Sequence, residues 1–140
     1  MYSRILLLSD GSAGDEVGLT AAASIAEAFR SSVQVLVAYR WPVMAEEFVV
    51  EMLREAGDIE AELKARASSA VEFLRKRGLD ATSTIRYGSE TEAVLQVAAA
   101  WGADLIVLPG CEAGPVKCRV VGCTSCRVAN RAEASVLVAR

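Results

Sequence analysis

The sequence predicts a doubly wound α/β fold, in which helices cover both faces of a five-stranded, mainly parallel sheet. Short apolar runs alternate with longer helical patterns along all 140 residues, as in βαβ units. Several runs are continuously apolar, which is typical of strands buried on both faces of a parallel sheet. Because the sequence contains no linker, low-complexity tract or internal repeat, we expect residues 1–140 to form one domain.

The first half of the chain is predicted to run from a central strand into a long helix. Ile5–Leu8 is a continuous apolar strand, Asp15–Phe29 an alanine-rich helix and Val33–Ala38 a second strand. The first helix has apolar residues at fourfold spacing: Val17, Ala21, Ile25 and Phe29. A long helical stretch from Glu46 to Arg77 follows.

The long helix has a weak point at Gly57 and Asp58 and an apolar stripe beyond it. The stripe consists of Ile59, Leu63, Ala67, Ala70, Val71 and Leu74. Gly78 is expected to end this helix. The next segment, Ala81–Tyr87, alternates like a half-buried strand, so we expect it at an edge of the sheet.

The last third of the chain repeats the pattern of helix and strand. Ser89 and Glu92 match a capping box, which opens a helix that ends near Trp101. A buried strand, a short helix and a closing strand are then expected, at Asp104–Leu108, Cys123–Ala132 and Ser135–Val138.

Composition excludes several classes of function. The net charge of −3 disfavours electrostatic binding to nucleic acid or to an anionic membrane. No apolar run approaches the roughly 20 residues that cross a bilayer, and the N-terminus is interpreted as a strand, not a signal peptide. We therefore expect a cytoplasmic protein. The absence of histidine removes Ser-His and Cys-His nucleophile pairs and histidine-ligated metals.

Two loops follow predicted strands and carry the residues of a candidate site. In such a sheet, ligands bind beyond the carboxyl ends of the strands, where the strand order reverses. In the first loop, Asp10-Gly11-Ser12, the aspartate can cap the turn and can also accept hydrogen bonds from ribose hydroxyls. In the second, Pro109–Ser125, the helix start after Gly122 offers N–H groups to a phosphate.

Over its whole length the sequence resembles a universal stress protein domain. The matching segments are ILLLSDGS, YGSETEAVLQVAAAWGADLIVLPG and VVGCTSCRVANRAEASVLVAR. The resemblance implies the strand order 3-2-1-4-5, a homodimer formed through the last strand (Ser135–Arg140) and, in many members, ATP binding. Because no set of residues supplies an evident base or nucleophile, we expect no catalytic residue and at most slow ATP hydrolysis with Mg²⁺.

The resemblance also implies which residues hold ATP or a related adenine nucleotide. Asp10, with Gly11 and Ser12 beside it, matches the family aspartate that contacts the nucleotide, and the backbone of Ala38 and Tyr39 falls where the adenine is met. The family's phosphate loop falls on Gly110, Gly114, Gly122, Cys123, Thr124 and Ser125.

This sequence departs from the family's phosphate loop, whose pattern is G-x2-G-x9-G-[S/T]. Gly122 is retained, but Cys123 replaces the hydroxyl residue, and Pro109 and Glu112 replace the first two glycines. Proline has no N–H to offer, and a glutamate repels phosphate. The alternative is a nucleotide-free member whose loop has acquired another function.

The four cysteines, Cys111, Cys118, Cys123 and Cys126, all lie within this loop and the helix start that follows it. Four interpretations stay open: packing of small side chains, a zinc or iron–sulfur site with four thiolate ligands, one or two disulfides, and a redox-sensing thiolate. Cys123, at a helix N-terminus, is the most reactive candidate of the last kind.

Overall fold

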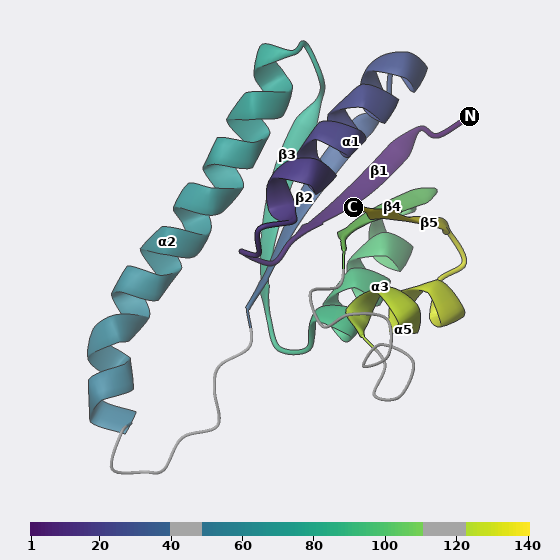
Figure 1. The fold of residues 1–140 in the computed structure, drawn as a ribbon. Helices are drawn as coiled ribbons and strands as arrows, with labels where there is room; N and C mark the ends of the chain where they lie inside the picture. The colour runs from purple at the N-terminus through teal and green to yellow at the C-terminus, as the bar shows by residue number, and fades with distance from the viewer. Residues whose placement is uncertain (40–48, 111–122) are drawn as a thin grey trace.

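The structure, a computed structural model, describes residues 1–39, 49–110 and 123–140, with backbone alone for 49–56. One five-stranded parallel sheet has the order β3-β2-β1-β4-β5, as predicted (Figure 1). The described elements are β1 (Arg4–Ser9), α1 (Asp15–Phe29), β2 (Ser32–Tyr39), α2 (Val49–Lys76), β3 (Ala81–Tyr87), α3 (Glu90–Trp101), β4 (Leu105–Pro109), α5 (Thr124–Arg131) and β5 (Ser135–Ala139).

The strand β1 lies in the middle of the sheet and separates two hydrophobic cores. Ile5 and Leu7 belong to the core under α1 and α2, while Leu6 and Leu8 belong to the core under α3 and α5. All four side chains are at most 2% exposed. Alternation along a strand sends successive side chains to opposite faces, so an uninterrupted apolar run is what a two-sided core requires.

The helix α1 buries a different face from its fourfold stripe. Its buried residues are Gly18, Ala22, Ala23 and Ala26, whereas Val17 and Phe29 are 42% and 44% exposed. Small residues let the helix lie close to the sheet: a Cβ on Gly18 would lie 3.5 Å from Leu7 Cδ1. Which face of α1 is buried therefore depends more on how closely the helix backbone can approach the sheet than on the size of the apolar side chains.

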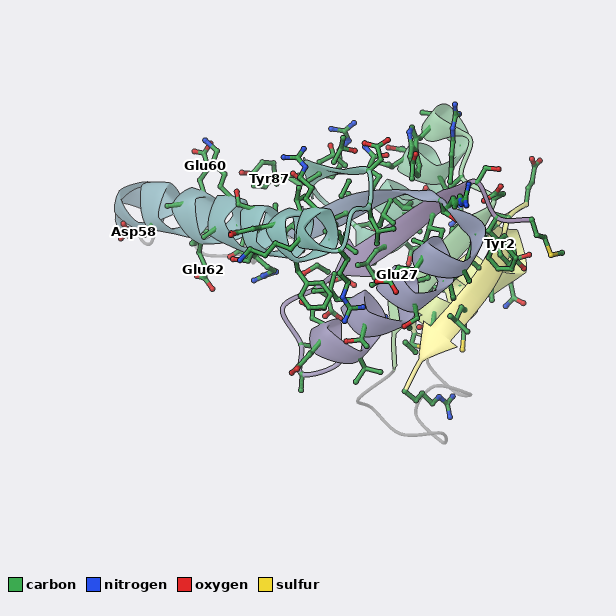
Figure 2. The ribbon with its side chains drawn as sticks, turned by 90° about the horizontal axis from the view of Figure 1, so that it is seen from above. Tyr2, Glu27, Asp58, Glu60, Glu62 and Tyr87 are labelled. Atoms are coloured by element: carbon green, nitrogen blue, oxygen red, sulfur yellow. The ribbon has the colours of Figure 1, made fainter. Side chains whose placement is uncertain are left out.

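The helix α2 runs unbroken through Gly57 and Asp58 and extends beyond the sheet at its N-terminal end. Figure 2 shows Glu60 and Glu62 projecting from opposite sides of this extension. The predicted stripe packs on the sheet, with Leu63 and Leu74 fully buried. Among the described residues, no helix combines the length and apolar character needed to cross a membrane.

The structure confirms the predicted edge strand, β3, and the predicted end of the preceding helix at Gly78. Gly78 has φ +79°, a conformation that glycine adopts without strain. β3 pairs with β2 alone and is exposed at four of its seven residues. The alternation of apolar and polar residues in this segment thus correctly indicates a strand at the edge of the sheet.

The predicted capping box at α3 is formed only in its first half. Ser89 Oγ accepts the Glu92 N–H at 3.5 Å, but the Glu92 carboxylate pairs with Arg131 of α5 at 2.7 Å. The long-range ion pair has replaced the local bond back to the N-cap. As a result, the first turn of α3 is linked to the last turn of α5.

Candidate functional site

A pocket of about 220 Å³ lies where the carboxyl ends of β1 and β4 meet the N-terminus of α5. These elements come from opposite ends of the chain and are brought together by the parallel pairing of β1 with β4 (Figure 1). The lining residues are Leu8, Asp10, Ser12, Glu90, Leu108, Pro109, Gly110, Cys123, Thr124 and Ser125. Both predicted loops therefore contribute to one pocket.

The turn between β1 and α1 is held by two aspartates. Asp15 accepts from Ser9 Oγ at 2.7 Å, from the Asp10 N–H at 3.0 Å and from the Gly11 N–H at 2.9 Å. Asp10 Oδ1 accepts the Ser12 N–H at 2.9 Å. The cap predicted at Asp10 is formed, but the larger share of the capping belongs to Asp15. Gly11 has φ +79°, a conformation that glycine adopts without strain.

The surroundings of Asp15 disfavour the ionised form of its carboxyl group. Burial raises the pKa of this carboxyl, and the Asp10 side chain raises it further, while the hydrogen bonds from Ser9, Asp10 N and Gly11 N lower it; the net direction is upward. The turn therefore concentrates negative charge at the edge of the pocket.

Glu90 adds a third carboxylate, which sequence reasoning missed. It is the first residue of α3, lines the pocket and accepts a hydrogen bond from Thr124 Oγ1 at 3.2 Å. Burial raises the pKa of Glu90, and the charges of Asp10 and Asp15 raise it further. Its place next to the capping serine was visible in the sequence, but its contact with a residue 34 positions away was not.

The N-terminus of α5 faces the same pocket. Cys123 is the N-cap residue, and the first helical bond joins the Arg127 N–H to the Cys123 carbonyl. The N–H groups of Thr124, Ser125 and Cys126 precede that bond and have no acceptor within the helix. Because such groups carry partial positive charge, this end of α5 can hold an anion.

The hydroxyl groups of this turn are already engaged with protein acceptors. Thr124 Oγ1 donates to Glu90, and Ser125 Oγ donates to the Pro109 carbonyl at 3.4 Å. Backbone N–H groups are therefore better placed than hydroxyls to meet a phosphate here.

Ala38 and Tyr39, predicted to meet an adenine, lie at the end of β2 and do not line the pocket. The β1–β2 ladder ends at the pair Ser9↔Val37, so both residues lie beyond it. The Tyr39 carbonyl accepts the Gly88 N–H at 2.8 Å on the β3 side. Because backbone groups alternate in direction along a strand, those of Ala38 face the β1 side, toward the pocket edge.

Gly110 follows β4 directly and lines the pocket. A Cβ there would lie 3.2 Å from the Ala139 carbonyl oxygen and 3.3 Å from Arg140 Cγ, so the close approach of β5 favours a glycine. The predicted phosphate-loop residues Gly114 and Gly122 lie outside the described residues.

The predicted cysteine cluster is described only in part. Cys111 and Cys118 lie outside the described residues, while the sulfur atoms of Cys123 and Cys126 are 3.5 Å apart. Within residues 1–39, 49–110 and 123–140, no group of three or more potential ligands is arranged to hold a metal ion. Four-thiolate coordination thus stays a prediction.

Arg66 of α2 is a second residue that the sequence did not single out. A Cβ built on Gly11 would lie only 2.8 Å from Arg66 Nη2, so the guanidinium covers the β1–α1 turn. This side chain is 26% exposed and lies 4.0 Å from Glu62. It places positive charge beside the turn that carries Asp10 and Asp15.

Comparison with known proteins identifies relatives of the whole chain. The model of the universal stress protein family matches residues 1–140. None of the curated proteins compared with the chain matches it.

Solved structures share the fold at low sequence identity. The universal stress protein UspA from Lactobacillus plantarum is 21% identical, with a TM-score of 0.82 over 99% of this chain and 98% of its own. A universal stress protein in complex with cAMP is 22% identical, with a TM-score of 0.79 over 99% and 97%. One from Archaeoglobus fulgidus in complex with dAMP is 18% identical, with a TM-score of 0.63 over 100% and 98%.

Proposed function

The chain belongs to the universal stress protein family, and from this premise we propose that it binds an adenine nucleotide in the pocket between β1, β4 and α5. One observation carries the proposal: a carboxylate at the end of β1 and a helix N-terminus, whose N-cap side chain makes no capping bond within the described residues, line the same pocket. These are the two groups that a ribose phosphate needs, a hydrogen-bond acceptor for hydroxyls and donors for an anion.

Asp10 holds the ribose in this proposal. Its carboxylate lines the pocket and its position is fixed by the bond from the Ser12 N–H. A carboxylate accepts hydrogen bonds from hydroxyls strongly because the acceptor is charged.

The first turn of α5 holds the phosphates. Its N–H groups lie at the pocket beside Gly110, the residue that follows β4. Glu90 would repel a phosphate at this end, so we propose that the nucleotide is taken up as its Mg²⁺ complex.

The adenine lies beyond the β1–β2 ladder, against the backbone of Ala38. The described pocket, about 220 Å³, is smaller than the roughly 300–1,000 Å³ of sites that enclose a drug-sized ligand. It therefore accommodates the ribose and the adjoining phosphate, with the base outside it. The cAMP and dAMP complexes of two structural neighbours support an adenine nucleotide as the ligand.

We propose binding without rapid turnover. The chain offers no histidine as a general base. The carboxylates that line the pocket, Asp10 and Glu90, accept hydrogen bonds from the turn and from α5. Any hydrolysis in the presence of Mg²⁺ is expected to be slow.

Isothermal titration with ATP, ADP, AMP and cyclic AMP, each with and without Mg²⁺, tests the proposal. We expect saturable binding of at least one adenine nucleotide, with GTP weaker because the base is recognised. The absence of binding by all four nucleotides, to protein stripped of ligand by denaturation and refolding, would overturn it.

A further inference from the structure

Two cysteine sulfurs are in contact at the edge of the pocket. Cys123 Sγ and Cys126 Sγ lie 3.5 Å apart, compared with about 2.05 Å in a disulfide. Cys123 lines the pocket and is partly buried, whereas Cys126 is exposed. A pair of thiols at this distance needs only side-chain rotation and a small backbone adjustment to form a bond.

The local backbone explains why these side chains meet. Cys123 is the N-cap of α5, with extended dihedral angles of φ −123° and ψ 171°, and Cys126 is the third helical residue after it. Extended N-cap geometry directs a side chain over the first turn, where it meets the residue three positions on, as in a capping box. Here the pair consists of two thiols, and Cys123 makes no side-chain bond to the turn's N–H groups.

The N-terminus of α5 favours the thiolate form of Cys123, its N-cap residue, while the carboxylates of Asp10 and Glu90 on the same pocket oppose it. A helix N-terminus stabilises a thiolate, and the thiolate is the form that reacts with peroxides. The exposure of Cys126 opens the pair to a small oxidant from solution.

We propose that Cys123 and Cys126 form a reversible dithiol/disulfide pair that is oxidised by hydrogen peroxide. One thiolate attacks a peroxide oxygen and becomes a sulfenic acid as the O–O bond breaks and hydroxide leaves. The second thiolate attacks this sulfur, an S–S bond forms, and hydroxide leaves again. The two thiol protons neutralise the two hydroxides, so two thiols and one peroxide give one disulfide and two waters. A dithiol reductant reverses the change by thiol–disulfide exchange.

Oxidation also changes the pocket, a consequence that rests on the proposed nucleotide binding. A disulfide draws Cys123 Sγ toward Cys126 and consumes both thiols, so that no thiolate forms at the N-terminal turn of α5. The N–H groups of that turn then meet a phosphate without a competing anion. We expect the oxidised protein to bind adenine nucleotide about two- to fivefold more tightly.

The test of the pair itself needs no nucleotide. A Cys111→Ser/Cys118→Ser variant keeps only the two cysteines of interest, and trypsin releases both in the peptide spanning residues 120–127. After substoichiometric peroxide, we expect this peptide to lose two hydrogens and to take up no alkylating reagent until a dithiol is added. Replacing Cys126 with serine in the same background is expected to stop the reaction at the sulfenic acid.

The inference is overturned if both thiols stay alkylatable after peroxide, if the disulfide links two molecules, or if the first stable product is a sulfinic acid. Nucleotide titration of the reduced and oxidised forms gives the second readout. Equal affinities would refute the coupling and leave the redox pair standing, whereas no binding to either form would refute the proposed function alone.

Discussion

Asp10 and Asp15 lie in one turn and have different tasks. Asp15 accepts three hydrogen bonds from the turn itself, while Asp10 accepts one, and of the two only Asp10 lines the pocket. We therefore assign the proposed ligand role to Asp10, while Asp15 chiefly holds the turn. This division can be tested at single residues.

Asp10→Ala is expected to weaken adenine nucleotide binding about 10- to 150-fold, since hydrogen bonds to a charged acceptor contribute roughly 1.5–3 kcal/mol. Isothermal titration of the purified variant measures the change. Asp80→Ala is the matched control, because Asp80 is exposed and bonds Ser32 at the amino-terminal end of the neighbouring strand. Equal affinities of Asp10→Ala and wild type would exclude Asp10 from the site.

Glu90 gives a prediction about pH. Its pKa is raised on folding, by burial first and then by Asp10 and Asp15. A raised carboxyl pKa stabilises the fold at low pH, and that stabilisation is lost as the pH rises through the folded-state value. Glu90→Gln is therefore expected to be more stable than wild type at pH 7, with the difference vanishing below the ordinary value of 4.5.

Urea unfolding at pH 4 and pH 7 measures this effect, and Glu92→Gln provides a control of opposite sign. Arg131 lowers the pKa of Glu92 by a hydrogen bond and by its charge, so the Glu92 contribution is present at neutral pH and lost as the pH falls. The same pH dependence for both variants would contradict the assigned environments.

At the scale of elements, the β1–α1 connection is held chiefly by the side chain of Asp15. Asp15→Ala leaves Ser9 Oγ and the N–H groups of Asp10 and Gly11 without their acceptor. We expect a loss of about 1–3 kcal/mol in the free energy of unfolding, measured by urea denaturation. Glu16→Ala, an exposed acid in the same helical turn, should change stability little; a similar loss in both would assign the effect to the helix dipole.

The elements themselves could be predicted well because their signals are local. The continuous apolar run of β1, the stop at Gly78 and the turn at Gly11 each follow from the chemistry of a few consecutive residues. The contacts that complete the candidate site could not be predicted this way. Thr124 meets Glu90 across 34 positions, and Arg66 covers Gly11 from another helix, so these pairings exist only once the sheet is assembled.

The same limit applies to two details of the helices. The apolar spacing of α1 includes Val17 and Phe29, which lie partly in solvent because the sheet packs against the alanine face that approaches most closely. Glu92 was expected to bond back to Ser89, but a cation from α5 was a stronger partner. In both cases tertiary contact overrode a correct local pattern.

At the scale of the whole molecule, the strand order leaves β5 at one edge of the sheet, beside β4. We propose that two copies pair through this strand (Ser135–Arg140), and size-exclusion chromatography with light scattering is expected to report twice the 14.9 kDa chain mass.

Edge strands present unpaired backbone groups, and a charge on the strand opposes pairing. Val138 is partly exposed, so Val138→Lys should shift the mass to that of a monomer. Thr82→Lys, on the exposed opposite edge β3, should leave it unchanged, and a monomeric wild type would refute the pairing.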